Sequence, residues 1–174
     1  MTEFINQILS LGSILILVIT FLALLGNYFA QLNFITKYFA KNKILTIGLI
    51  SLAGAIGSLI YSIGIGYPPC DWCWYQRVFI YATAIIALTS AVTKKPLDLV
   101  YIWVLTIMGF VISVYHNITY YTDFSPIPCD AVVSCTAKYV NEYGFMSIPL
   151  MALMLFVSVM FILGTRNSIS ASRE

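Results

Sequence analysis

The feature that most constrains this chain is a series of apolar runs that are long enough to cross a lipid bilayer as α-helices. Crossing requires about 20 predominantly apolar residues. Five runs meet this requirement, at residues 4–28, 45–65, 74–92, 97–120 and 145–163. Only 9% of the 174 residues are charged, against roughly 25% in soluble domains. The sequence therefore predicts an all-α integral membrane protein with five crossings.

The first run could in principle be a secretory signal peptide rather than a membrane helix. Signal peptides begin with a positively charged segment and have an apolar core of about 7–15 residues. Residues 1–3 carry no basic side chain, and the apolar stretch that follows them is longer than such a core. We therefore expect the first run to be a transmembrane helix.

Basic residues are divided unevenly between the connections, and this predicts the orientation in the membrane. Lysine and arginine accumulate in cytoplasmic loops. Seven of the nine follow the first, third and fifth runs: Lys37, Lys41, Lys43, Lys94, Lys95, Arg166 and Arg173. The connections at residues 66–73 and 120–144 contain only Lys138, but four acidic residues. We expect these connections and the N-terminus to face outward, and the C-terminus to be cytoplasmic.

The net charge of +2, dispersed between apolar runs, argues against nucleic acid as a partner.

All four cysteines, Cys70, Cys73, Cys129 and Cys135, lie in the two connections that are predicted to face outward. Disulfides persist in oxidising compartments, so the even count suggests two pairs. Proximity in the sequence favours 70 with 73 and 129 with 135. A Cys-x-x-Cys disulfide closes too small a loop to remove much chain entropy. The first pair is therefore better suited to redox exchange than to stabilising the fold.

The first pair stands where the third run begins, directly after Pro68 and Pro69. At a helix N-terminus, the unpaired N–H groups and the helix dipole lower the pKa of a cysteine. Arg77 lies one turn beyond Cys73 on about the same face and adds positive charge. The pattern therefore predicts a reactive thiolate at Cys73.

The second pair lies in a stretch that begins with prolines and continues with a helical pattern. Asp130 could cap a short helix, and Gly144 would end it. Apolar and aromatic residues recur at helical spacing, with polar residues opposite them. The apolar face would contain Ala131, Val132, Cys135, Tyr139, Val140 and Tyr143, and the polar face Lys138, Asn141 and Glu142. This pattern predicts an amphipathic helix on the membrane surface, which could carry a disulfide between a soluble partner and the membrane-embedded pair.

Two other interpretations of the cysteines remain open at this point. Four cysteines could bind zinc, although Cys-x-x-Cys combined with Cys-x5-Cys is an unusual spacing for zinc ligands. Both pairs could also be inert structural disulfides, a role that suits the second pair better than the first.

The residues from Cys70 to Arg77, Cys-Asp-Trp-Cys-Trp-Tyr-Gln-Arg, resemble the Cys-x-x-Cys-x-x-x-Arg motif of the disulfide bond formation protein B family. Pro128-Cys129 and Cys135 extend the resemblance, which covers about residues 45–165 and includes the short second loop of Gram-positive members, often called BdbC. The opposite order of the two pairs would have resembled vitamin K epoxide reductase instead.

The resemblance implies a DsbB-like four-helix transmembrane bundle at residues 43–166. An additional N-terminal transmembrane helix and a cytoplasmic loop would occupy residues 1–42, and a cytoplasmic tail residues 167–174. The implied activity is that of a thiol:quinone oxidoreductase in the bacterial inner membrane, which supports disulfide bond formation.

The resemblance also implies an order of electron transfer through the four cysteines. Cys129 would accept a mixed disulfide from a reduced, DsbA-like oxidase of the thioredoxin fold. Cys135 would then exchange with Cys70, and Cys73 would face the quinone, either ubiquinone or menaquinone.

By the same resemblance, the quinone would be contacted by three further side chains. Arg77 would polarise a quinone carbonyl, and His116, the only histidine, would donate a hydrogen bond or a proton. Gln76 could assist the quinone or join two helices by a hydrogen bond. No metal is expected. A belt at the membrane interface, rather than a quinone site, best explains three aromatic residues: Trp72, Trp74 and Tyr75.

Two alternative functions predict different behaviour. A membrane scaffold whose disulfides only brace its outer loops would not depend on quinone. A protein that passes thiol electrons across the membrane would need a thiol on the cytoplasmic side, where the sequence places no cysteine.

Overall fold

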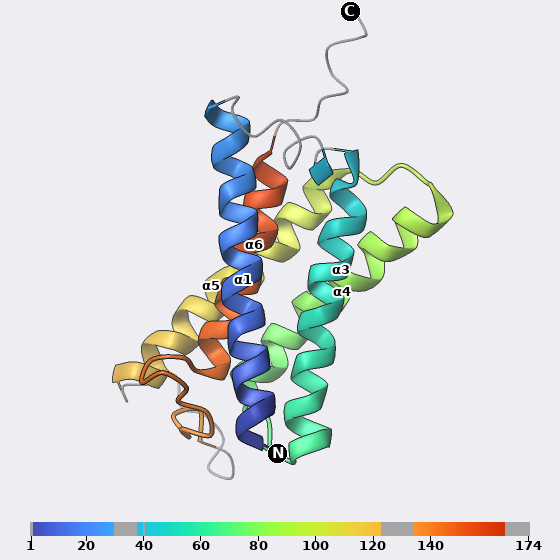
Figure 1. Cartoon of the computed structure of the whole chain (residues 1–174). Coiled ribbons are helices and arrows are strands. Elements are labelled where there is room, and N and C mark those ends of the chain that lie inside the picture. The colour runs from blue at the N-terminus through green and yellow to red at the C-terminus, as the bar shows by residue number, and fades with distance from the viewer. Residues whose placement is uncertain (1, 30–37, 40, 123–133, 166–174) are drawn as a thin grey trace, which may run out of the picture.

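A computed structural model of the chain describes residues 2–29, 38–39, 41–122 and 134–165. Within this part of the chain the long helices are α1 (Thr2–Phe29), α3 (Lys43–Leu59), α4 (Asp71–Thr93), α5 (Leu99–Thr122) and α6 (Ile148–Gly164). A π-helical turn, η1 (Ile60–Ile65), extends α3. Successive helices run in opposite directions, so the connections alternate between the two ends of the molecule (Figure 1).

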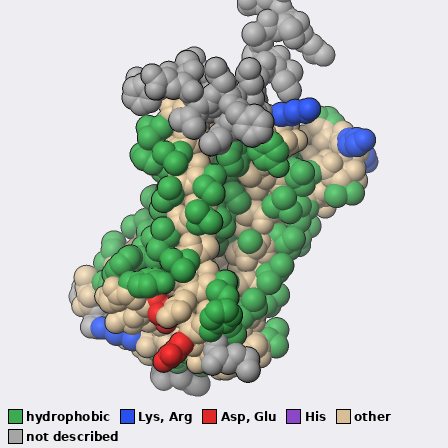
Figure 2. Space-filling view, in the orientation of Figure 1, with side chains coloured by type: hydrophobic (Ala, Val, Ile, Leu, Met, Phe, Trp, Pro, Cys, Tyr) green, Lys and Arg blue, Asp and Glu red, His purple; other side chains and the backbone are tan. Residues whose placement is uncertain are grey.

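The helices have the length and surface of membrane-spanning segments. Four segments are long and apolar enough to cross a bilayer, namely Thr2–Gly26, Lys43–Ile65, Asp71–Thr93 and Leu99–Thr122, while α6 is apolar but has only 17 residues. Hydrophobic side chains cover the sides of the helices, and the charged side chains gather at the ends (Figure 2). Such a surface is stable in lipid and not in water. The predicted all-α, multi-pass membrane fold is confirmed.

Helices α3 to α6 form a four-helix bundle, and α1 packs on the outside of it, chiefly against α6. Close approach of the helices depends on glycines, as is common in membranes. A Cβ at Gly48 would lie 2.8 Å from the side chain of Leu88 on α4, and one at Gly109 would lie 2.2 Å from the ring of Phe156 on α6. Because α1 contacts the bundle chiefly through α6, this additional N-terminal helix forms a layer of its own beside the bundle.

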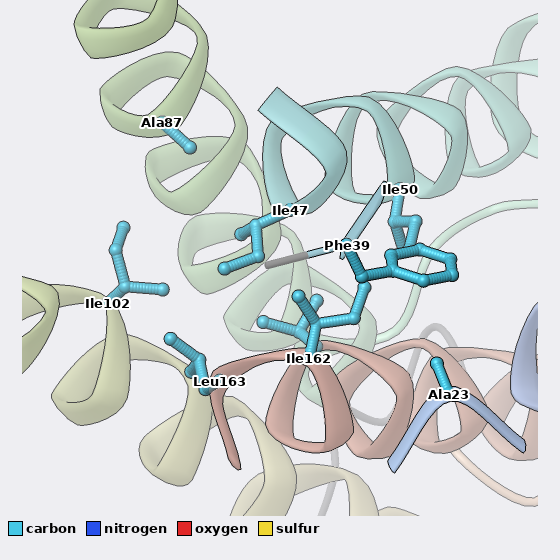
Figure 3. Close-up of a cluster of buried hydrophobic side chains, with 9 residues drawn as sticks. Ala23, Phe39, Ile47, Ile50, Ala87, Ile102, Ile162 and Leu163 are labelled. Atoms are coloured by element: carbon cyan, nitrogen blue, oxygen red, sulfur yellow. The ribbon is translucent and has the colours of Figure 1, made fainter. Parts of the chain in front are cut away.

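The two ends of the bundle differ in the residues they carry. The end with Lys43, Lys94 and Lys95 is here named the basic end, and the end with Cys70 and Cys135 the cysteine end. Near the basic end, buried apolar side chains from several helices meet in one cluster (Figure 3). It consists of Ala23, Phe39, Ile47, Ile50, Ala87, Ile102, Val159, Ile162 and Leu163. At this end the Lys43 ammonium donates hydrogen bonds to the carbonyls of Leu163 and Thr165, and so satisfies the C-terminus of α6.

The last helix begins three residues later than the apolar run predicted. Ser147 is its N-cap and accepts a hydrogen bond from the backbone N–H of Leu150. The preceding residues form a tight turn, in which Glu142 and Met146 pair as an isolated β-bridge. Gly144 has a φ of 79°, a conformation that glycine adopts without strain. Helix α6 therefore cannot extend back to residue 145.

The predicted amphipathic surface helix is wrong for the residues that the structure describes, 134–143, while 131–133 lie outside them. This segment consists of turns. The backbone N–H of Thr136 bonds to the Ser134 hydroxyl, a local contact that competes with helix formation. Further along, the Tyr139 ring stacks on Tyr67 at 4.9 Å, and the Val140 carbonyl accepts a hydrogen bond from Tyr120. Contacts with the bundle thus decide the path of a segment whose local pattern favoured a helix.

Candidate active site

The Cys-x-x-Cys pair lies where the sequence places it, at the first turn of α4. Pro68 and Pro69 keep the chain extended up to Cys70, which is the N-cap of the helix with φ −74° and ψ 172°. One helical turn then brings the two sulfurs together, with 3.1 Å between the Sγ atoms of Cys70 and Cys73. Both are free thiols in this structure. This is the geometry of a dithiol that can close into a disulfide with little movement.

His116 on α5 contacts the pair from the side of Cys70. Its Nε2 lies 3.6 Å from the Cys70 sulfur, and the imidazole is 1% exposed. The hydrogen bond from the Cys73 thiol, followed by the hydrogen bond and charge of His116, lowers the pKa of Cys70 to about 5, although burial opposes this shift. The sequence predicted the stabilised thiolate at Cys73. The structure places these stabilising contacts on Cys70. The Cys73 thiol reaches it from one turn along α4, and His116 reaches it from α5.

Arg77 lies one turn further into the membrane and is 8% exposed. Its Nη2 donates a 2.9 Å hydrogen bond to the carbonyl of Ser58 on α3, and its guanidinium lies 5.0 Å from the centre of the Trp74 ring. Within the described ranges no carboxylate forms an ion pair with this arginine. A buried cation held by a carbonyl and an aromatic ring keeps its charge available to a ligand.

Gln76 joins two helices, as one of the two interpretations from the sequence allowed. Its Nε2 donates a 3.1 Å hydrogen bond to the Ser113 hydroxyl on α5. This bond fixes α4 against α5 on the same stretch that carries His116, so Gln76 helps to hold the histidine next to the cysteines.

A single cavity of about 300 Å³ opens onto these groups. Six of the predicted site residues line it: Cys70, Cys73, Gln76, Arg77, His116 and Cys135. The remaining walls are mostly apolar and come largely from α1, α3, α6 and residues 134–140. Small-molecule sites are typically apolar pockets of about 300–1,000 Å³ with a few polar groups, and this cavity has that character. Trp72, Trp74 and Tyr75 do not line it, which fits their interpretation as an interfacial belt.

Cys135 reaches this cavity from the segment between α5 and α6. It is buried and disulfide-bonded, whereas Cys129 lies outside the described residues. A cysteine in a disulfide does not ligate a metal, so Cys135 is not available to a four-cysteine zinc site in this structure. Cys70, Cys73 and His116 have donor atoms within 4.8 Å of one another, which leaves three potential ligands for a soft metal ion.

Comparison with known proteins identifies the family. The family model described as "Disulfide bond formation protein DsbB" matches residues 40–165. This chain belongs to the DsbB family. The SPbeta prophage-derived disulfide bond formation protein B of Bacillus subtilis (strain 168) is 34% identical over 125 residues, which cover 71% of this chain and 84% of that protein. Disulfide bond formation protein C of the same strain is 32% identical over 124 residues, 68% of this chain and 90% of that protein. No solved structure gives a significant match.

The DsbB match includes every predicted site residue and leaves α1 outside, because it begins at residue 40. Sequence reasoning did not identify the parts of the site that arise only from packing. The backbone carbonyl of Ser58 on α3 holds Arg77, and a backbone contact of this kind leaves no signal in the sequence. The residues of α1 that line the cavity, among them Gly12 and Ser13, carried no signal that could have singled them out.

Proposed function

We propose that this DsbB-family protein is a thiol:quinone oxidoreductase, which reoxidises an extracytoplasmic dithiol oxidase of the thioredoxin fold and passes the electrons to a membrane quinone. The observation that carries the proposal is the shared cavity, which is lined by the Cys70–Cys73 pair and also by Cys135 and Arg77. Thiol exchange and transfer to a small apolar acceptor can both occur there.

The proposed reaction consists of two successive disulfide exchanges and one reduction of a quinone. The dithiol of the partner reduces the disulfide of Cys129 and Cys135 and leaves as a disulfide, so two electrons and two protons now reside on those cysteines. They reduce the Cys70–Cys73 disulfide in turn, and this pair delivers the two electrons to a quinone, which takes up two protons in all, one of them from water when Cys70 is a thiolate, and leaves as the quinol. A low pKa makes Cys70 a good leaving group when its bond to Cys135 is broken.

The residues of the cavity fit the ring of a quinone. Arg77 offers a cation to a carbonyl oxygen as negative charge develops on it. The Nδ1 of His116 is buried and has no hydrogen-bond partner among the described residues, so it can bond to a polar atom of a ligand. The apolar walls exclude water and accept a flat ring. The quinone, when bound, supplies the two-electron acceptor that the chain itself lacks.

The distribution of charge supports an orientation for this reaction. Lys43, Lys94 and Lys95 lie at the basic end, which we assign to the cytoplasm, and the cysteine end then faces outward. The partner would reach Cys129 and Cys135 from the outer compartment, where disulfides persist. The C-terminus would be cytoplasmic.

The decisive measurement is quinone reduction by the purified protein, supplied with a reduced thioredoxin-fold oxidase and either ubiquinone or menaquinone. Wild type should turn over, and Cys73→Ser should abolish turnover because the pair can no longer close into a disulfide. A folded wild type with intact disulfides that reduces neither quinone would refute the proposal and favour the scaffold alternative.

A second experiment tests which cysteine meets the partner. In Cys135→Ala, the lone Cys129 thiol can attack the disulfide of an oxidised partner, and no Cys135 thiol is left to release the mixed disulfide within the chain. Mixed with the oxidised partner, Cys135→Ala should therefore accumulate a covalent complex on non-reducing gels. Cys129→Ala is the matched control and should not. The reverse result would assign the contact with the partner to Cys135.

A further inference from the structure

Helix α1 lies outside the residues that match the DsbB family, yet it forms one wall of the redox cavity. Its contribution comes from Ile8, Leu9, Gly12, Ser13 and Ile16, which follow one face of the helix. A second part of the wall is supplied by α3, with Gly54, Gly57 and Ser58 among its residues. The extra helix is thus placed to act on whatever ligand the cavity holds.

Helix α1 is packed less closely against α3 than against α6. It packs chiefly against α6, and its contacts with α3 are few. A Cβ at Gly12 would meet no atom within 4 Å, although this residue lines the cavity. On the opposite side, a Cβ at Gly57 would lie at ordinary contact distance, 3.6 Å, from Leu9. A side chain larger than hydrogen at Gly12 would therefore extend into open space at the edge of the cavity.

The size of the cavity leaves room for a ring and not for a long tail. About 300 Å³ is at the lower end of the range for small-molecule sites, which runs to about 1,000 Å³. The polar groups that would hold a ring, Arg77 and the unpartnered Nδ1 of His116, belong to α4 and α5, whereas Gly12 belongs to α1. A lipid-soluble ligand whose ring is bound there must pass its tail out between helices, on an apolar path.

We infer that α1 and α3 form a lateral opening through which the isoprenoid tail of the membrane quinone leaves the redox cavity for the lipid, with Gly12 keeping this opening free. This inference rests on the proposed function, since it assigns the path of the same ligand. It gives the extra N-terminal helix a role in selecting acceptors that carry a tail.

The test compares Gly12→Leu with Gly64→Leu in the full-length protein, using dithiothreitol as the electron donor so that no partner is needed. Gly64 is exposed on η1, does not line the cavity, and its Cβ would meet only Ile60 at 3.8 Å. Each variant is assayed with a quinone that carries an isoprenoid tail and with a naphthoquinone that has none.

Gly12→Leu should raise the KM for the tailed quinone about tenfold, equivalent to about 1.4 kcal/mol of binding, and should leave the KM for the tail-less quinone nearly unchanged. Gly64→Leu should change neither. An unchanged KM for the tailed quinone in folded Gly12→Leu, or equal increases for both quinones, would overturn the inference. If wild type itself reduces neither quinone, it is the proposed function that fails.

Photolabelling gives an answer that does not depend on how the variant folds. A quinone with a photoreactive diazirine in its tail should label peptides from residues 2–29 of the wild-type protein, and excess unlabelled tailed quinone should compete. Labelling confined to the other helices would place the tail elsewhere and would contradict the inference.

Discussion

The two ends of this bundle are built from the same helices but differ in how they are filled. At the basic end, apolar side chains such as Ile47, Ile102 and Ile162 are fully or almost fully buried against one another (Figure 3). The cysteine end has a smaller buried cluster, of Tyr61, Val140, Met146 and Met151, and it also holds the cavity. Most of the buried polar atoms that lack a hydrogen-bond partner among the described residues also lie there, on Asn6, Ser10, His116, Asn117 and Thr119.

This difference indicates that the basic end chiefly stabilises the fold and that the cysteine end chiefly serves the reaction. Lipid surrounds both ends, so helix association depends on close packing rather than on the hydrophobic effect. The basic end provides that packing. The cysteine end leaves space and unpaired polar groups, which cost stability and which a ligand can satisfy. We therefore expect substitutions at the cysteine end to change the reaction, and substitutions at the basic end to change stability.

The largest effect on the reaction should come from Arg77→Met. Loss of the guanidinium removes the cation that faces the developing charge, so quinone reduction should fall about 100-fold, while the thermal midpoint changes little. Arg77→Lys keeps a charge without the planar group and should fall in between. If Arg77→Met is folded and fully active, the arginine serves only to bond to the Ser58 carbonyl.

The largest effect on stability should come from the basic end, with Ile162→Ala. This side chain is 0% exposed, and its truncation should lower the free energy of unfolding by about 3 kcal/mol. The matched control is Ile85→Ala, at a side chain that is 65% exposed on α4, and it should cost far less. The KM for quinone should not move in either variant. A changed KM in Ile162→Ala would show that the two ends are coupled.

A smaller effect is expected where the two regions meet, with Gly109→Ala. The new methyl group would lie 2.2 Å from the Phe156 ring, and such overpacking should cost about 2 kcal/mol. Because Phe156 also lines the cavity, the KM for quinone should rise as well. Gly64→Ala, whose Cβ has room, serves as the control in thermal denaturation and kinetics. Normal stability in Gly109→Ala would mean that α5 and α6 can move apart without cost.

The smallest effect should be a shift in pH dependence with His116→Phe. A thiol with a pKa of about 5 is a thiolate at neutral pH. The rate at which Cys70 is methylthiolated in the reduced protein, corrected for the reagent alone, should therefore be nearly constant from about pH 6 to 8. It should fall below about pH 5, where the thiolate is protonated. Removing His116 takes away one stabiliser of the thiolate, so the midpoint should move to higher pH. The shift should be partial, since the hydrogen bond from Cys73 remains. Mass spectrometry of Cys70 at each pH measures it, and an unchanged midpoint would contradict the assigned contact.

The sequence was a reliable guide wherever a property depends on neighbouring residues. The membrane crossings follow from the length and composition of each run, and tertiary contacts moved their ends by only a few residues. The redox pair and Arg77 also lie within two turns of one helix, so their spacing alone places them together.

The sequence pattern predicted the wrong secondary structure where contacts with other helices decide the path of the chain. The helical spacing at residues 134–143 was overridden by a serine turn and by contacts with Tyr67 and Tyr120. A segment with few local hydrogen bonds of its own takes the path that buries its side chains best, and that path depends on helices that are distant in the sequence.

The sequence by itself determined that this protein has membrane-spanning helices and that Cys70 and Cys73 lie together at the start of one of them. Only the tertiary structure decided which thiol is stabilised as a thiolate and which helix forms the last wall of the cavity. The contact from His116 to Cys70 joins residues 46 apart in the chain, and α1 reaches the cavity by packing against α6. Such contacts depend on how complete helices pack, which no short stretch of sequence specifies.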